Sequence, residues 1–365
     1  MMRRGLFLVL SVIPCVLLIQ YYYYILTPAA FKKSDVRSAQ NLQIKNILYW
    51  TKMFGRKDFN LGQGSEVFQD CEVNNCYATS QKNYLPVDQF DAIVFHPNEF
   101  SWNDMDIPQN RSRDQIYIYS NQESPMNTKQ RALEARGFYN WTMTYRLDSD
   151  ILRPYGYYQK TTTQYKTPTV EEVKQKPHAV AWMVSHCGAY SKRDDLYRNL
   201  SKYIPIHVYG SCGDRYCPKD DFEGCYDLLA QNYKFYLSFE NSICLDYVTE
   251  KLYAALMRNI VPIVYGGADY RKIAPPNSVI DVTRFNSVEE LAEYIKELDG
   301  NPEKYLSYFE WKKTYVVGRS NKPTLCTLCK KLNEPIARKS YDNIDKWWVE
   351  GTCRFDNKLP KIIFT

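Results

Sequence analysis

The 365-residue sequence has little surplus charge of either sign. Its 47 Lys and Arg residues against 41 Asp and Glu residues give a formal net charge of +6. Arg3 and Arg4 account for two of these charges, and the remaining +4 (6 − 2) is dispersed along the chain. Such a balance argues against a nucleic-acid-binding surface. The sequence also lacks a glycine-rich loop of the P-loop or GxGxxG type, which argues against an NTPase or a dehydrogenase.

Low-complexity tracts and internal repeats are absent apart from a run of four tyrosines at 21–24. Hydrophobic residues make up 45% of the chain and charged residues 24%, values that exclude a disordered or fibrous protein. The length is typical of about two domains. Aromatic residues reach 15%, including 32 tyrosines, and this composition favours surfaces that bind sugars or rings.

No charged residue occurs between Arg4 and Lys32, and most of the intervening side chains are apolar. A helix needs about 20 such residues to span a membrane, and tyrosines favour the interface where a helix leaves the bilayer. We therefore expect a cytosolic tail at 1–4, a transmembrane signal anchor at 5–26 and a stem at 27–45. The alternative is a cleaved signal peptide with a cut site near Ala29-Ala30, although signal-peptide apolar regions are shorter, about 7–15 residues.

Ten of the eleven cysteines follow this segment, together with N-x-S/T sequons at Asn110, Asn140 and Asn199. An even number of cysteines in a chain that can be glycosylated indicates disulfides in an oxidising lumen. With the anchor, this predicts a single-pass type II membrane protein whose body is lumenal. A zinc site built from Cys326-x-x-Cys329 with Cys71 and Cys76 is the competing interpretation, but only one pair has the tight zinc-ligand spacing.

From residue 46 onward, short β-rich runs alternate with helical patterns, which is typical of α/β layers. A polar, Thr- and Lys-rich stretch at 159–176 separates the runs into domains at 46–170 and 171–365. A capping box is expected at Ser287 and Glu290. The predicted strands are Ile47–Trp50, Ala92–Phe95, Ile116–Tyr119, Ala179–Val184, Ile206–Tyr209, Phe235–Phe239, Ile260–Val264 and Ser278–Val282. The predicted helices are Asp194–Lys202, Tyr247–Met257, Val288–Leu298 and Pro302–Trp311.

The densest set of chemistry-bearing residues lies in YKFYLSFENSICLDYVTEKLYAALMRNIVPIVYGGAD, residues 233–269. Its pattern of strand, polar loop, amphipathic helix and strand predicts a βαβ unit, in which ligands bind beyond the carboxyl ends of the strands. Glu240, Asn241, Glu250 and Lys251 cluster between the first strand and the first helical turn. A carboxylate can bind ribose hydroxyls and a lysine can neutralise a phosphate. The alternative is that Glu250 and Lys251 form only a solvated first turn.

Two further acidic positions are candidates for chemistry. Asp148 and Asp150 have a spacing that can hold a divalent metal against a nucleotide diphosphate, although a capped turn has the same pattern. Glu123 directly follows the predicted strand Ile116–Tyr119. Pro125, two residues later, would hold that loop rigid, which suits a positioned carboxylate.

The stretch 233–270, continuing through Ala274-Pro275-Pro276 to Phe285, resembles the signature region of the α1,3-fucosyltransferases (glycosyltransferase family 10). Glu123-Ser124-Pro125 and the segment 141–150, WTMTYRLDSD, resemble the upstream blocks of that family in the same order. The resemblance covers about residues 46–330. It implies two Rossmann-like domains of the GT-B type behind an N-terminal transmembrane helix, anchored in the Golgi membrane. It also implies inverting transfer of L-fucose from GDP-fucose to O3 of N-acetylglucosamine, with no required cofactor; stimulation by a divalent metal is left open.

The resemblance carries roles to individual residues. Glu123 matches the proposed general base. Asn241, Tyr247, Glu250 and Lys251 match the donor-binding block, with Glu250 facing the ribose and Lys251 the diphosphate. Arg193 resembles, over a looser local match, the phosphate-binding arginine. The rival hypotheses are a metal-dependent transferase that uses Asp148 and Asp150, and a catalytically inactive membrane-anchored glycan-binding protein.

The chain departs from many vertebrate members of this family in two respects. It has extra cysteines at Cys212, Cys217, Cys225 and Cys244, and it has the segment Gly266-Gly267-Ala268-Asp269-Tyr270. The 266–270 segment, together with Ala274-Pro275-Pro276 and with Cys244 inside the donor block, looks more like invertebrate members, many of which fucosylate the core of N-glycans, so we favour a core acceptor over outer lactosamine arms. We also expect Cys71 and Cys76 to pair with Cys326 and Cys329, although spacing alone does not fix connectivity among ten cysteines.

Overall fold

The computed structural model describes residues 43–100, 107–128, 136–163, 165–218, 220–354 and 360–364. Ile44–Thr365 forms one compact unit. The predicted tail and anchor and nearly all of the predicted stem lie outside the described residues. None of the helices within the described ranges combines the length and apolar character needed to cross a bilayer.

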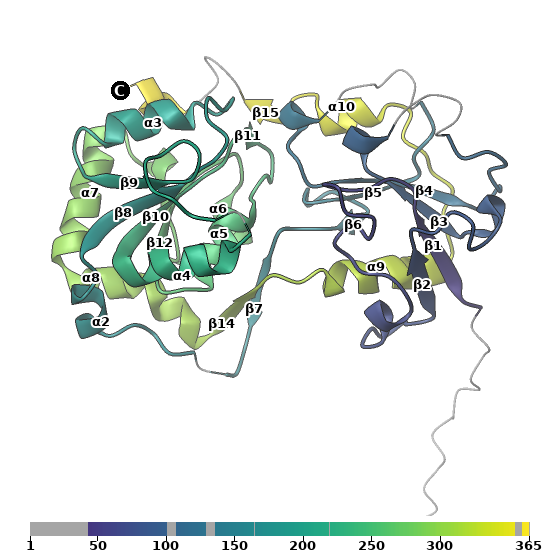
Figure 1. Cartoon of the computed structure of the whole chain (residues 1–365), viewed down its shortest axis with the longest axis horizontal. Coiled ribbons are helices and arrows are strands. Elements are labelled where there is room, and N and C mark those ends of the chain that lie inside the picture. The colour runs from purple at the N-terminus through teal and green to yellow at the C-terminus, as the bar shows by residue number, and fades with distance from the viewer. Residues whose placement is uncertain are drawn as a thin grey trace, which may run out of the picture. The chain divides into compact units, whose positions relative to one another are not determined.

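The N-terminal half is built on a parallel sheet of six strands in the order β2-β1-β3-β4-β5-β6 (Figure 1). Its central strands are buried throughout, as expected for a parallel sheet covered on both faces. The strands are β1 (Lys45–Tyr49), β2 (Cys76–Thr79), β3 (Ala92–Phe95), β4 (Ile116–Asn121), β5 (Trp141–Thr144) and β6 (Ile151–Leu152).

The C-terminal half contains a second parallel sheet, in the order β13-β12-β10-β8-β9. The chain leaves β8 for β9 on one side and returns to β10 on the other, so the direction of winding reverses between β8 and β10. Ligands bind at such a switch point in open α/β sheets. The strands are β8 (His178–Met183), β9 (Ile206–Tyr209), β10 (Tyr233–Phe239), β12 (Val261–Tyr265) and β13 (Ile280–Asp281).

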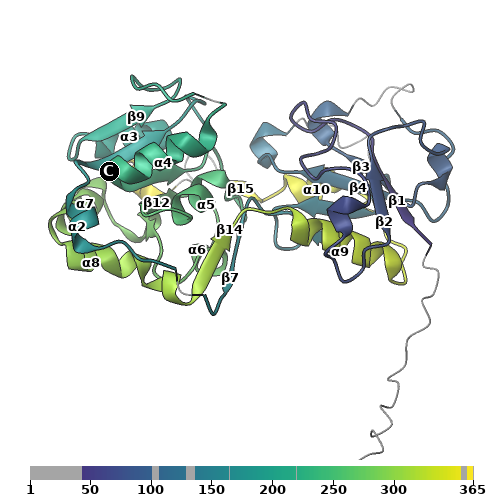
Figure 2. The same ribbon diagram turned by 60° about the horizontal axis from the view of Figure 1, so that its bottom comes forward.

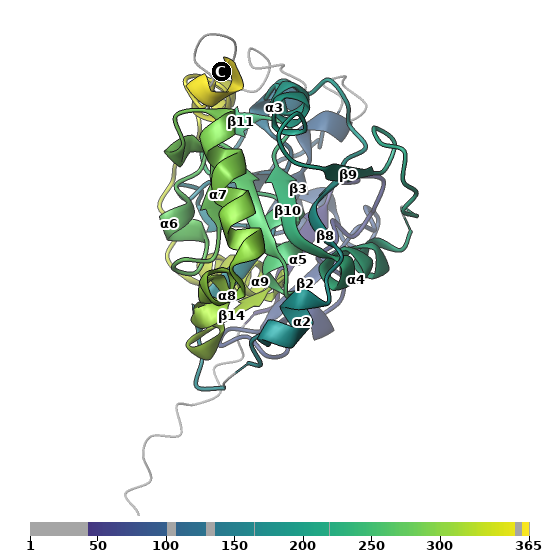
Figure 3. The same ribbon diagram turned by 90° about the vertical axis from the view of Figure 1, so that its left-hand side faces the viewer.

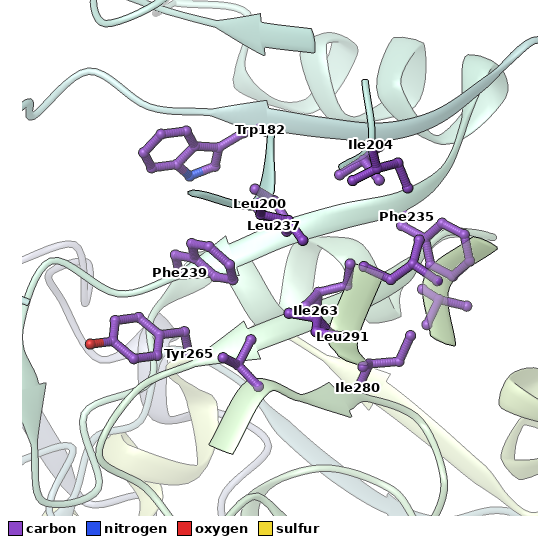
Figure 4. Packing of buried hydrophobic residues seen from close by; sticks show 14 of the residues in the cluster. Trp182, Leu200, Ile204, Phe235, Leu237, Phe239, Ile263, Tyr265, Ile280 and Leu291 are labelled. Carbon is purple, nitrogen blue, oxygen red and sulfur yellow. The ribbon is translucent and has the colours of Figure 1, made fainter. Parts of the chain in front are cut away.

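Alternation along β10 distributes its side chains to two helical layers. Phe235, Leu237 and Phe239 pack with Leu200 of α3 (Arg193–Leu200) and Leu291 of α7 (Val288–Gly300) in the largest core cluster, which Figure 4 shows. Figure 3 shows α7 running across this face of the sheet. Tyr236 points to the opposite face and packs on helices α4 (Phe222–Asn232) and α5 (Glu250–Leu256).

Two antiparallel ribbons join distant parts of the chain: β7 (Tyr157–Lys160) pairs with β14 (Tyr315–Gly318), side by side in Figure 2, and β11 (Ile243–Cys244) pairs with β15 (Cys353–Arg354). The other helices are α2 (Val170–Lys174), α6 (Tyr270–Ile273), α8 (Pro302–Leu306), α9 (Lys322–Asn333) and α10 (Ile344–Trp348). The 3₁₀ turns are Glu66–Phe68, Val87–Gln89, Pro97–Glu99, Pro125–Asn127, Val282–Arg284, Ser307–Lys313 and Lys361–Phe364.

The last part of the chain returns to the first sheet. Leu325, Leu328 and Leu332 of α9 belong to the core cluster of the N-terminal half, and Trp348 of α10 joins a second cluster there (Figure 1). The disulfides Cys71–Cys326 and Cys76–Cys329 fix α9 in place. These are the four cysteines that we expected to pair with one another. The domain division at 170/171 stays a prediction, with α9 and α10 lying against the first sheet rather than the second.

Several local expectations need correction. The predicted helix Pro302–Trp311 consists of α8 followed by a 3₁₀ segment, and the predicted strand Ser278–Val282 is only the two-residue β13. The capping box at Ser287 is half formed: Ser287 Oγ accepts the Glu290 N–H (3.1 Å), but the Glu290 carboxylate accepts the N–H of Asn286 (2.8 Å) instead. Neighbouring main-chain N–H donors, those of Asn286 and Ser287, compete for the one Glu290 carboxylate, and the sequence does not rank them.

Candidate active site

A cavity of about 270 Å³ lies at the carboxyl ends of β8 and β10, at the switch point of the second sheet. Four of the five residues that the sequence assigns to the donor line it: Arg193, Asn241, Glu250 and Lys251. Three connections form its walls, namely β8–α3, β9–α4 and β10–α5. The cavity therefore lies where the fold class predicts a nucleotide site.

Glu240 holds the start of α5, the helix that carries Glu250 and Lys251 of the cavity lining. Its carboxylate, 1% exposed, accepts the Thr249 N–H (2.8 Å) and the Thr249 hydroxyl (2.9 and 3.0 Å). It thereby caps the N-terminus of α5 from the end of β10, a position where the helix dipole favours negative charge. Lys251 Nζ lies 3.4 Å from Glu240 Oε2, 3.1 Å from Glu250 Oε1 and 2.8 Å from Thr249 Oγ1. The lysine is thus held between two carboxylates rather than free in solvent.

The titration of this cluster follows from burial and mutual attraction. Burial raises the pKa of Glu240 above its ordinary value, and the nearby Lys251 opposes that effect. For Glu250, burial acts in the same direction, but attraction by Lys251 prevails and its pKa is lowered. Burial would lower the pKa of Lys251, but Glu240 and Glu250 raise it. Glu250 and Lys251 are therefore ionised at neutral pH, and the solvated-turn alternative does not describe them.

Arg193 opens α3 and is 2% exposed. Two of its guanidinium N–H groups donate to main-chain carbonyls, at Phe239 (2.8 Å) and His186 (2.8 Å), so it joins the end of β10 to the β8–α3 connection. Its Nε has no hydrogen-bond partner among the described residues. Burial lowers its pKa. Its guanidinium is consequently fixed in direction at the cavity wall, while a role toward phosphate stays a prediction.

Tyr247 does not line the cavity. Its ring packs against Tyr145 of the N-terminal half, with centroids 5.1 Å apart, in a cluster that includes Trp348. Two other contacts between the halves involve residues close to these in the sequence. Ser124 Oγ and Ser242 Oγ are 2.8 Å apart, and Asp246 Oδ2 accepts the Leu147 N–H at 3.0 Å. The structure therefore places Tyr247 in the seam between the two halves.

Glu123 lies at this seam. It follows β4, and its N–H donates to Asn121 Oδ1 (3.0 Å), which fixes the turn that carries it. Its Oε2 atom is buried and has no hydrogen-bond partner within the described ranges. Burial raises the pKa of its carboxyl above the ordinary value, against the opposing attraction of Lys251. A half-buried carboxyl group with one buried, unpartnered oxygen and a raised pKa, within electrostatic reach of a lysine of the C-terminal half, has properties that suit a general base.

Asp148 and Asp150, the acids of the metal hypothesis, are occupied by other contacts. Asp148 forms a bidentate pair with Arg146 (2.6 and 2.9 Å). Asp150 accepts from the Thr142 N–H (3.0 Å) and the Tyr341 hydroxyl (3.0 Å) and also pairs with Lys339. These contacts hold the segment around α10 to the first sheet. The described residues contain no group of three or more His, Cys, Asp or Glu side chains arranged to bind a metal.

The three sequons differ in their surroundings. Asn110 is exposed, and Asn199 is half-buried. Asn140 accepts the Tyr117 N–H (2.8 Å) and donates Nδ2 to the Lys339 carbonyl (2.8 Å), so its amide already links the sheet to the C-terminal segment. Glycosylation of all three asparagines stays a prediction.

Sequence reasoning missed His186 and the wall from α4. His186 lines the cavity and acts electrostatically on Glu123. Its position just beyond the buried strand β8 was a usable signal, because ligands gather at the carboxyl ends of parallel strands. Phe222 and Tyr226 of α4 also line the cavity. Their role depends on helix packing, for which the sequence carries no local signal.

Comparison with known proteins agrees with this geometry. Residues 42–156 match the family model "Fucosyltransferase, N-terminal", and residues 173–347 match "Glycosyltransferase family 10 (fucosyltransferase) C-term". The chain is 38% identical over 343 residues to "Alpha-(1,3)-fucosyltransferase C" of Drosophila melanogaster, covering 86% of this chain and 80% of that protein.

Two further relatives differ in the acceptor that their names state. One is "4-galactosyl-N-acetylglucosaminide 3-alpha-L-fucosyltransferase 9" of Rattus norvegicus, 36% identical over 83% of this chain and 81% of that protein. The other is "Glycoprotein 3-alpha-L-fucosyltransferase A" of Drosophila melanogaster, 35% identical over 85% of this chain and 62% of that protein.

The fold resembles a solved "alpha1,3-Fucosyltransferase with GDP-fucose", with a TM-score of 0.56 and 19% identity over 82% of this chain and 93% of that one. This likeness supports an α/β architecture of two parallel sheets of the GT-B kind. Together with the domain matches and the identity to curated relatives, it leads to one conclusion: the chain belongs to glycosyltransferase family 10, the fucosyltransferases.

Proposed function

We propose that this chain transfers L-fucose from GDP-fucose to O3 of an N-acetylglucosamine residue in glycoprotein glycans, with inversion at the anomeric carbon. The observation that carries the proposal is the placement of Glu123. This half-buried glutamate of the N-terminal half lies within electrostatic reach of Lys251 of the C-terminal half, next to the seam contact between Ser124 and Ser242.

In a single displacement at the anomeric carbon of fucose, each of these residues has a separate role. Glu123 accepts the proton of the acceptor O3–H group as that oxygen attacks the anomeric carbon. The bond from that carbon to the β-phosphate oxygen breaks, and GDP leaves with the bonding electron pair and its developing negative charge. Lys251 and Arg193 stabilise this charge in a buried setting, where such interactions are strong. Glu250 accepts from ribose hydroxyls. A base and leaving-group cations on opposite sides of the sugar suit inversion.

For the acceptor we favour the N-acetylglucosamine of the N-glycan core, with lactosamine arms as the alternative. The support is the resemblance of the 266–270 segment, Ala274-Pro275-Pro276 and Cys244 to invertebrate members, and the similarity to a relative named as a glycoprotein fucosyltransferase. The similarity to a relative named for galactosylated acceptors supports the alternative, lactosamine arms. Discrimination depends on buried polar groups matched to acceptor hydroxyls.

The test is mass spectrometry of defined glycans after incubation of the purified full chain with GDP-fucose. One acceptor is an N-glycan with terminal N-acetylglucosamine and no galactose; the other is free N-acetyllactosamine. Fucose on the first, inside the core, supports the proposal. Fucosylation of lactosamine alone refutes the core assignment, and GDP binding without transfer to either acceptor supports an inactive binding protein. Retained activity in EDTA removes the metal-dependent hypothesis.

We further propose that the protein acts in the Golgi lumen as a single-pass type II membrane protein anchored by residues 5–26. In support, the described part of the chain contains five disulfides, which persist in oxidising compartments. Protease protection in sealed vesicles tests the orientation: digestion of the catalytic body without detergent contradicts it.

A further inference from the structure

One wall of the donor cavity differs chemically from the others. The β9–α4 connection and the first turns of α4 contribute Gly210, Cys217, Pro218, Phe222, Cys225 and Tyr226 to its lining. This wall is aromatic and apolar, whereas Arg193, Asn241, Glu250 and Lys251 on the other walls are charged or polar. A nucleoside diphosphate has the same division, with a flat base at one end and a charged diphosphate at the other.

The β9–α4 connection, unlike α4 itself, has little hydrophobic burial to hold it. Tyr216 is 85% exposed, and residues 213–215 are also exposed. A connection of this kind opens locally at low free-energy cost. Its main-chain hydrogen bonds to the sheet and the end of β8 include Arg215 N–H to the Val208 carbonyl (3.1 Å) and Cys212 N–H to the Val184 carbonyl (3.2 Å).

Two disulfides restrict the movement of the β9–α4 connection. Cys187–Cys212 joins the β8–α3 connection to the β9–α4 connection, and Cys217–Cys225 closes the end of that connection on to α4. Both bridges border the cavity: Cys217 and Cys225 line it, as do His186 and Gly210 nearby. Gly210 itself is fixed by a φ of +92° and by the Val184 carbonyl, only 2.5 Å from where a Cβ would lie.

We propose that the two disulfides hold this wall as the binding face for the purine base of the donor. The inference rests on the proposed function and goes beyond it, because it makes two structural bridges determinants of donor affinity. The base packs between Phe222 and the sulfur atoms of Cys217–Cys225, a type of contact that favours aromatic rings. Because the wall is fixed before the donor arrives, binding does not have to order it.

The test removes one bridge and separates base from phosphate. In the full chain, Cys217→Ser combined with Cys225→Ser opens an eight-residue span of sequence and leaves the other four bridges. We expect the KM for GDP-fucose and the inhibition constant of GDP to rise about tenfold, with kcat at saturating donor within about twofold. Inhibition by inorganic pyrophosphate, which has no base, should be unchanged. A loss of folding would instead lower kcat and abolish the cooperative melting transition.

The matched control is Cys71→Ser with Cys326→Ser, which removes a bridge from the N-terminal half while Cys76–Cys329 still holds α9. Its GDP inhibition should equal that of the unaltered protein. Phe222→Ala tests the same wall with every bridge intact and should weaken GDP but not pyrophosphate.

Three outcomes overturn the inference. GDP inhibition unchanged in both cavity variants shows that the wall does not contact the base. Equal weakening of GDP and pyrophosphate shows that it acts on the phosphates. Absence of GDP inhibition in the unaltered protein refutes the proposed function itself, and with it this inference; the first two outcomes refute the inference alone.

Discussion

Replacing Glu123 with glutamine tests the proposed general base most directly. The substitution keeps the size of the side chain and the contact of the Glu123 N–H with Asn121 (3.0 Å), but removes the ability to accept a proton. A general base contributes about 10²–10⁴ in rate, or about 2.7–5.4 kcal/mol at 1.36 kcal/mol per factor of ten. We expect the upper part of this range, because the Oε2 atom of this carboxylate is buried and has no partner among the described residues.

The dependence of kcat/KM on pH gives a second, independent test of the general base. Only ionised Glu123 accepts the acceptor proton, and burial raises its pKa above the ordinary value. In the unaltered protein, kcat/KM should therefore fall as pH drops through this raised pKa. The Glu123→Gln variant should lack that limb. A profile that is unchanged by the substitution contradicts the assignment, whatever the absolute rate.

The assay is transfer from saturating GDP-fucose to a defined glycan, with GDP affinity measured by calorimetry. The variant should bind GDP nearly as the unaltered protein does. Glu72→Gln is the control, since Glu72 is a glutamate of the same half whose side chain is 81% exposed. Turnover of Glu123→Gln within about threefold of the control would refute the reasoning and remove Glu123 from the chemistry.

Three further predictions concern charge and its surroundings. Lys251→Ala should weaken GDP binding at least about tenfold and also lower the melting temperature, because it strands two buried carboxylates; calorimetry that finds unchanged affinity would leave Lys251 a structural residue. Asp150→Ala should cost about 2–3 kcal/mol of unfolding free energy in urea melts, from its lost charged hydrogen bonds, without changing GDP affinity. Burial lowers the pKa of Lys176 to about 7 and that of Lys312 to about 8. The unfolded chain keeps these protons to higher pH than the folded protein does. The free energy of unfolding should therefore rise between pH 7 and 9 by up to about 1.4 kcal/mol per pH unit for each lysine. Lys176→Met should flatten this dependence on pH, and an unchanged slope in that variant contradicts the prediction.

The donor block could be predicted because it is local. Asn241, Glu250 and Lys251 lie within eleven residues of one strand–loop–helix unit, and the geometry of that unit brings them together at the carboxyl end of β10. Tyr247, in the same block, shows the limit of this reasoning. Its ring turns toward Tyr145 because the N-terminal half offers an aromatic partner there, and no local pattern encodes that partner.

The sequence by itself determined the alternation of strands and helices, the positions of about half of the described strands, the cluster from Glu240 to Lys251 and the family. These depend on hydrophobic periodicity and short-range spacing, which are properties of contiguous residues. Only the tertiary structure decided the rest. It brought Glu123 into electrostatic reach of a lysine 128 residues later (251 − 123), returned α9 to the first sheet, and paired Cys217 with Cys225 at the cavity wall. Such contacts form between segments far apart along the chain, or between cysteines with several partners within reach, and their choice depends on the packing of the whole molecule.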